Sequence, residues 1–108
     1  MAKIINKTPH SVNVVSKEGE VIVTYNPEGE PARCSQETVV IGNINDIPLT
    51  KTSFGDVLDL PDPQPDTFYI VSRLVLSACP DRNDLIVPNE LVRDDEGHIV
   101  GCMSFAIN

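Results

Sequence analysis

The chain has 108 residues, of which 16 are acidic and 8 basic, and its formal net charge is −8 at pH 7. This length predicts a single domain spanning residues 1–108, large enough to bury a core without metals or disulfides. The acidic balance repels nucleic-acid backbones and anionic membrane surfaces, so we expect neither a nucleic acid polymer nor a membrane as partner. Because aromatic residues make up 5% of the chain, the core is expected to consist mostly of Val, Ile and Leu, which favours a sheet.

The cysteines and the amino terminus predict a cytoplasmic protein. Cys34, Cys79 and Cys102 lie far apart with no CxxC spacing, and their odd number leaves at least one thiol unpaired, as is typical of a reducing compartment. The first ten residues, MAKIINKTPH, lack the apolar segment of a signal peptide. No apolar run approaches the ~18 residues of a membrane span.

The first part of the chain predicts a short strand followed by a hairpin. Residues 3–6 form an apolar run, and residues 11–15 alternate as in a strand, with Thr8-Pro9-His10 as a bend between them. Residues 16–19 have the composition of a turn, and residues 20–25 alternate again. We therefore expect residues 11–25 to form an antiparallel hairpin.

A second hairpin and a connector are expected next. The polar turn at residues 26–31 is followed by candidate strands at 32–35 and 38–41. After a turn at 42–46, residues 47–51 are the expected return strand, which Pro48 places at a sheet edge because proline cannot donate to a ladder. The remaining residues, 54–66, are expected to form a connector rich in Asp and Pro.

The connector contains four carboxylates that resemble calcium ligands in composition. The spacing of Asp56, Asp59, Asp62 and Asp66 lacks the alternating Asp/Asn positions and the closing Glu of an EF-hand loop. We interpret this segment as a solvated loop and expect no metal site. The acidic segment at residues 94–97 is interpreted as a turn between strands at 90–93 and 98–105, in which Gly97 supplies a positive φ.

Residues 67–88 predict a strand, a short helix and a second strand. Ser72 is a favoured N-cap and Pro80 a stop, so the helix is expected over residues 73–79; one continuous strand is the alternative. The helix is preferred because the apolar runs at 68–71 and 85–87 can then be parallel neighbours joined by a crossover. The predicted fold class is therefore α+β, a mostly antiparallel or mixed sheet built from hairpins with one short helix.

This strand–helix–strand unit also predicts a ligand site. Sites form beyond the carboxyl ends of parallel strands, where Ser72 and Arg73 are expected to provide an anion site. The alternative is that Ser72 merely caps the helix and that Arg73 is solvated. Arg82 and Asp84 follow in the next connection, where they are either part of the site or a local ion pair that fixes the turn.

His10 is the other polar residue that the pattern singles out, because it follows a rigid bend and precedes a strand. Neither His10 nor His98 has a second histidine or a cysteine at metal-ligand spacing, so no zinc site is expected. A Cys–His pair of His10 with Cys79 or Cys102 remains an alternative, although packed thiols are normally inert. We expect no catalytic residue and no cofactor.

Four segments, INKTPHSVNVV, YIVS, PDRNDLIVP and DDEGHIVGC, resemble a family of small, mostly uncharacterised phage and bacterial proteins that open with an N-x-TPH-x-V motif. The resemblance covers most of the chain and implies a protein of phage or prophage origin that acts in the host cytoplasm. The resemblance implies no established chemistry for this chain. It includes Thr8, His10, Ser72, Arg82 and Asp84.

The predicted function is non-enzymatic sequestration of a nucleotide-like, phosphate-bearing host defence signal. The ligand-binding set consists of polar residues that follow strands or flank the helix: Thr8, His10, Ser72, Arg73, Arg82 and Asp84. The alternative is a module that binds a phage or host polypeptide, and a small hydrolase is less favoured. A homo-oligomer, with a dimer as the first expectation, would enclose a ligand that so thin a domain cannot enclose alone.

Overall fold

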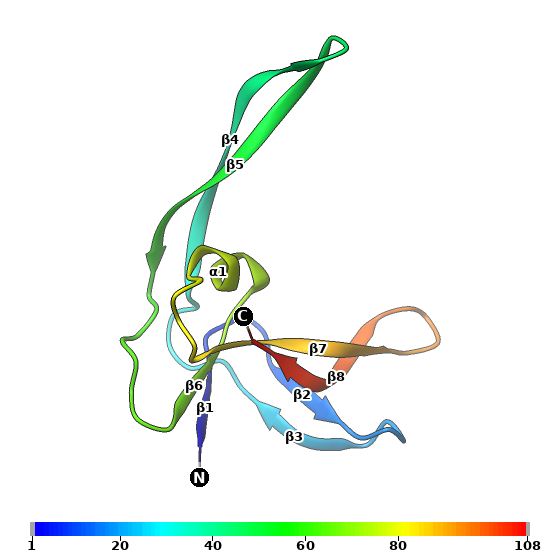
Figure 1. Cartoon of the computed structure of the whole chain (residues 1–108). Coiled ribbons are helices and arrows are strands. Elements are labelled where there is room, and N and C mark those ends of the chain that lie inside the picture. The colour runs from blue at the N-terminus through cyan, green and yellow to red at the C-terminus, as the bar shows by residue number, and fades with distance from the viewer. Residues whose placement is uncertain (1, 108) are drawn as a thin grey trace.

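The computed structural model describes residues 2–107 and confirms the predicted α+β fold class, mostly β with a short helix (Figure 1). The elements are, in chain order, β1 (Lys3–Asn6), β2 (Val12–Val15), β3 (Val21–Tyr25), β4 (Arg33–Ile44), β5 (Ile47–Leu58), β6 (Thr67–Ile70), α1 (Arg73–Ala78), β7 (Leu85–Arg93) and β8 (Ile99–Ala106). Within residues 2–107, no helix is long and apolar enough to cross a lipid bilayer.

Six of the strands in the described residues form one mixed sheet in the order β1-β6-β7-β8-β2-β3. β1 and β6 are parallel, as are β6 and β7, whereas β7 and β8 form an antiparallel hairpin. β2 joins β8 in parallel through Val14 and Cys102. β1 and β3 are the outer strands of this order, and a parallel bridge connects Asn6 of β1 to Pro27, just after β3. The sheet is therefore closed on itself.

The side chain of Asn6 holds this closure together. Asn6 is fully buried, and its Nδ2 donates to the main-chain oxygens of Tyr25 (2.8 Å) and His10 (2.7 Å). Its Oδ1 accepts from the main-chain N–H of Thr8 (2.9 Å) and lies 2.6 Å from the Thr8 hydroxyl. All of the hydrogen-bonding capacity of this amide is thus used to connect the end of β1 to the loop that follows and to the end of β3.

The predicted helix and the predicted parallel strand pair are both confirmed. α1 begins after Ser72, whose hydroxyl oxygen accepts the N–H of Val75 (3.2 Å), and ends just before Cys79 and Pro80. β6 and β7 pair in parallel, Tyr69 with Leu85. The alternative of one continuous strand is therefore wrong. The core lies between this unit and the neighbouring elements and comprises Ala32, Tyr69, Val71, Val75, Leu76, Leu85 and Val87.

The two predicted hairpins at residues 11–25 and 90–105 are confirmed as β2–β3 and β7–β8, and Gly97 has the expected positive φ of 85°. The second predicted hairpin is confirmed in position but is much longer than predicted. β4 continues through Gln36 and Glu37, and β5 continues to Leu58, so part of the predicted connector is strand. A bulge in β5 opposite Ser35 and a bulge in β4 near Ile41 break the alternation that would have revealed the full strands.

We call the hairpin of β4 and β5 (residues 33–58) the arm. It projects away from the six-stranded sheet beyond α1, which packs against its base (Figure 1). The turn at its tip consists of Asn45 and Asp46, both with positive φ, as in the two-residue turns typical of tight hairpins. Most residues of both strands are exposed.

Candidate functional site

A pocket of about 380 Å³ opens where β1 and β6 end. Because these strands are parallel, Asn6 and Ile70 lie side by side in the ladder, and the main-chain N–H of Lys7 donates to the oxygen of Ile70 (2.8 Å). The loop at residues 7–11 and the segment at residues 71–73 therefore leave the sheet at the same edge. This is the position at which ligand sites form in sheets with parallel strands.

Four of the six predicted site residues line this pocket: Thr8 and His10 from the first loop, and Ser72 and Arg73 from the second segment. Ser11 and Asn13 add further polar groups from the start of β2. The convergence of Thr8 and His10 with Ser72 and Arg73 results from the β1–β6 pairing. The sequence placed these residues after strands but did not indicate that the two strands are neighbours.

Arg73 provides the cation of the pocket. Its side chain is exposed, and no other group within residues 2–107 forms a hydrogen bond or ion pair with its guanidinium. The hydroxyl oxygen of Ser72 accepts the N–H of Val75, but its own proton can still be donated. Thr8 differs, because its hydroxyl is directed to Asn6 and to the main-chain oxygen of His10. Thr8 therefore shapes the loop, while Arg73 and Ser72 offer donors.

The floor of the pocket is apolar. It includes the buried residues Val71, Val87 and Cys102, and Leu91 and Ile99 contribute exposed aliphatic surface from β7 and β8. Burial raises the pKa of the Cys102 thiol, against main-chain hydrogen bonds that lower it. A thiol in this environment is protonated near neutral pH and is a weak nucleophile.

Gly101 allows β8 to approach β2 at this pocket. A Cβ atom on Gly101 would lie 2.9 Å from the main-chain oxygen of Asn13 and 2.8 Å from Cγ1 of Val15. Asn13 also donates through Nδ2 to the oxygen of Val100 (3.2 Å). The absence of a side chain at Gly101 is therefore required by strand packing.

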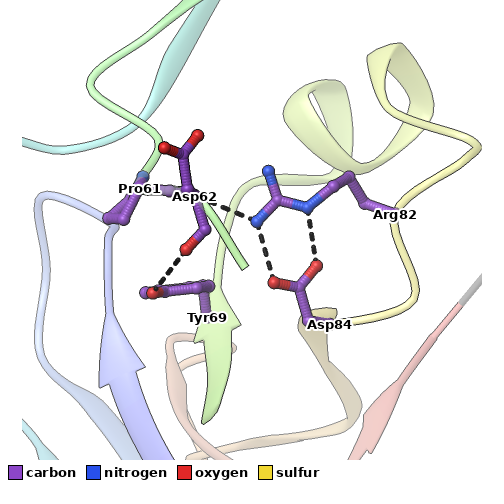
Figure 2. Close-up of polar contacts among 5 residues, drawn as sticks. All are labelled: Pro61, Asp62, Tyr69, Arg82 and Asp84. Atoms are coloured by element: carbon purple, nitrogen blue, oxygen red, sulfur yellow. Dashed lines mark hydrogen bonds and ion pairs between the residues drawn. The ribbon is translucent and has the colours of Figure 1, made fainter. Parts of the chain in front are cut away.

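The other two predicted site residues, Arg82 and Asp84, do not line the pocket. They form a bidentate ion pair, with Nε 2.7 Å from Oδ1 and Nη2 2.8 Å from Oδ2 (Figure 2). Nη2 also donates to the main-chain oxygen of Pro61 (3.0 Å), and Asp84 is 8% exposed. Hydrogen bonding to Arg82 lowers the pKa of Asp84 and raises that of Arg82.

This arrangement corresponds to the ion-pair alternative for the two residues. The pair attaches the connector between β5 and β6 to the loop after α1, and the hydroxyl of Tyr69 donates to the main-chain oxygen of Asp62 (3.2 Å) beside it (Figure 2). Nε and Nη2 of Arg82 are therefore already occupied by Asp84 and by the main-chain oxygen of Pro61. The six predicted residues thus separate into a pocket group and a structural pair.

Two residues of the pocket region that matter most were not predicted from the sequence. Asn6 is a polar residue at the end of an apolar run, and its Asx-turn to Thr8 is a recognisable local signal. Gly101 lies in an apolar strand, and nothing near it in the sequence indicates the close approach of β2. In the part of the chain that the structure describes, no group of three or more His, Cys, Asp or Glu side chains is placed to hold a metal ion.

The chain matches no protein-family model, no curated protein and no solved structure. The resemblance to small phage and bacterial proteins stays a prediction, and the functional proposal depends on the residues of the pocket.

Proposed function

We propose that this chain is a non-enzymatic binding protein whose pocket sequesters a small, nucleotide-like molecule that bears phosphate. The observation that carries this proposal is the Arg73 guanidinium, which has no partner within residues 2–107 and stands at a pocket with an apolar floor. A cation without an internal partner beside a buried apolar surface suits a ligand that has an anionic part and a hydrophobic part.

The phosphate is assigned to Arg73 and the hydroxyl of Ser72 beside it. The planar guanidinium offers several N–H donors that match two phosphate oxygens at once, and such charge-assisted hydrogen bonds are stronger than neutral ones. Ser72 supplies a further donor at the same pocket, whereas the hydroxyl of Ser11 already donates to Oδ1 of Asn26 (3.0 Å). A local cation of this kind can hold an anion even though the chain has a net charge of −8.

The base, or another flat ring, is assigned to the aliphatic surface of Val87, Leu91 and Ile99. The pocket volume of about 380 Å³ lies in the range of about 300–1,000 Å³ that is typical of small-molecule sites. Its size fits a ligand of roughly one nucleotide, or one part of a larger cyclic or dinucleotide molecule.

A binding role is favoured over catalysis because the residues suited to nucleophilic chemistry are poorly prepared for it. Cys102 lies in the same pocket as His10, but burial raises the pKa of its thiol. An activated cysteine requires the opposite shift. The ligand is therefore expected to be held and released unchanged, which is the behaviour of a protein that removes a signal from solution. The resemblance to phage proteins makes a host defence signal the proposed target.

Isothermal titration and thermal shift with cyclic nucleotides, cyclic dinucleotides and ADP-ribose derivatives test this function. We expect at least one probe to raise the melting temperature and to be recovered chemically intact. Arg73→Ala should weaken its binding by about 10- to 100-fold, the effect of one charge-assisted hydrogen-bonding group, without changing the melting temperature of the free protein.

The matched control is Arg93→Ala. Arg93 is also exposed, lies in β7 outside the pocket, and donates to the main-chain oxygen of Gly97 (2.8 Å). This variant should bind the probe like the wild type. Equal loss of affinity in both variants would show that only the overall charge matters, and turnover of the probe would show that the protein is an enzyme.

The second candidate function, a module that binds another polypeptide, is supported by the arm with its exposed apolar side chains.

A further inference from the structure

The arm exposes apolar side chains along both of its strands. Its exposed aliphatic and aromatic residues are Val39, Val40, Ile41, Ile44, Ile47, Leu49, Phe54 and Leu58. Beyond its base, where Cys34 and Val57 pack against the core, neither face of the arm is covered by other residues of the described chain. An isolated two-stranded hairpin is marginally stable in water, so a hairpin this long is expected to pack against something.

The surface area of the chain indicates how much of it a partner would cover. The described residues expose 7450 Å², whereas a monomeric protein of 11.8 kDa is expected to expose about 5,900 Å². The excess of about 1,500 Å² per chain exceeds the ~800 Å² that each partner buries in a standard interface. The radius of gyration is 16.6 Å, against about 13 Å for a compact domain of this length, because the arm projects away from the rest of the chain. An interface between two such chains would be in the range of stable homodimers.

The charges of the arm favour a second copy of this chain as the partner. The arm is almost neutral, with Arg33 and Lys51 against Glu37, Asp46 and Asp56, so nearly all of the net charge of −8 lies on the rest of the chain. Two copies that meet through their arms keep their acidic parts apart and avoid most of the repulsion between them.

One face of the arm is suited to pairing with itself. Cross-strand neighbours point to the same side, and every second residue of a strand does so as well, which places Val39, Lys51, Leu49 and Ile47 on one face together with Glu37. We call this the Lys51 face. It combines aliphatic side chains with one acidic and one basic residue, so a twofold axis can set Glu37 of each copy against Lys51 of the other.

We propose that two copies of this chain form a symmetric dimer by packing the Lys51 faces of their arms against each other. This goes beyond the proposed function, since no residue of the ligand pocket belongs to the arm.

The first experiment measures the mass of the full chain by light scattering and sedimentation at micromolar concentration. Wild type is expected to be a dimer, and Ile47→Glu should weaken dimerisation at least tenfold, because it places a carboxylate in the apolar contact. The matched control is Ile22→Glu in β3, since Ile22 and Ile47 are both 66% exposed. Ile22→Glu should remain a dimer. A monomeric wild type, or dissociation by Ile22→Glu in place of Ile47→Glu, would overturn the proposal.

The second experiment tests the reciprocal charge contact within the dimer. E37K and K51E should each dimerise more weakly than wild type, because like charges then face each other. A mixture of the two variants should form mixed dimers more tightly than either forms alone, since opposite charges again meet across the axis. An ion pair within one arm could not be restored by mixing, so mixed dimers no tighter than those of the separate variants would contradict the arrangement.

Discussion

The side-chain amide of Asn6 donates to the main-chain oxygen of Tyr25 over 2.8 Å, which joins the end of the first strand to the end of the third. The same amide holds the loop that carries Thr8 and His10, both of which line the pocket. One buried side chain therefore closes the sheet and shapes one wall of the proposed ligand site.

Replacement of Asn6 by Ala should strongly destabilise the fold. The variant removes a fully buried amide and leaves the main-chain oxygens of Tyr25 and His10 without their donor, so we expect the free energy of unfolding to fall by about 2–4 kcal/mol. Urea denaturation measures the change. Asn13→Ala is the control, because Asn13 is partly exposed and its loss should lower stability by less than about 1 kcal/mol. Similar losses in both variants would argue against a special role for Asn6.

The Arg82–Asp84 pair should stabilise the protein in a pH-dependent way. Asp84→Asn removes the bidentate contact and should lower the free energy of unfolding by about 2 kcal/mol at neutral pH. Because the pKa of Asp84 is lowered in the folded protein, its contribution is complete above the ordinary value of 3.8 and is lost as pH falls through the folded pKa. Wild type and Asp84→Asn should therefore converge in stability below pH 3.8. A constant difference down to lower pH would contradict this account, as would a loss of ligand affinity in a stably folded Arg82→Ala variant.

Substitution of Gly101 tests the close contact between β8 and β2. Gly101→Ala places a Cβ against the main-chain oxygen of Asn13, which cannot move aside without shifting a strand, and should lower stability by about 1–3 kcal/mol. Gly42→Ala is the matched control, because nothing lies within 4 Å of the position of its Cβ. Thermal denaturation of the two variants compares them directly. Equal melting temperatures would show that the two strands tolerate separation.

His10 should contribute to ligand binding through its ring. The ring lines the pocket and has no hydrogen-bond partner within residues 2–107. His10→Ala should therefore weaken the binding of a phosphodiester probe, measured by isothermal titration at one pH. His98→Ala is the control, since His98 is exposed in the β7–β8 turn and outside the pocket. Equal affinities of wild type and His10→Ala would exclude His10 from the ligand contact.

Local signals in the sequence were sufficient to predict the two strands and the helix of the strand–helix–strand unit. Ser72 as cap and Pro80 as stop defined α1, and the apolar runs on either side became the parallel strands β6 and β7. These features depend on residues close together in the chain, for which capping and backbone restrictions act directly.

The sequence could not show which distant strands pair. The pairing of Lys3 with Thr67 brings the Thr8 loop to Arg73, but each strand carries the same apolar pattern whichever neighbour it has. The length of the arm was underestimated because both of its faces are exposed. Without a buried face the strand needs no regular apolar alternation, so the polar residues Gln36 and Glu37 looked like a break between two shorter strands. The sequence also could not show whether Arg82 and Asp84 belong to a ligand site or form an ion pair. Arg82 donates to the main-chain oxygen of Pro61 as well, and Pro61 lies far away in the sequence, in the connector.

The two-residue turn at Asn45 and Asp46 has a consequence for the order of folding. The arm is built from neighbouring segments and can close from its tip within microseconds, the ordinary time for a hairpin. The six-stranded sheet must wait until residues 3–6 meet residues 67–70 and the long intervening loop has been closed. During synthesis, the whole arm emerges before β6 is available to β1, so its apolar side chains are presented to other chains before the ligand pocket exists.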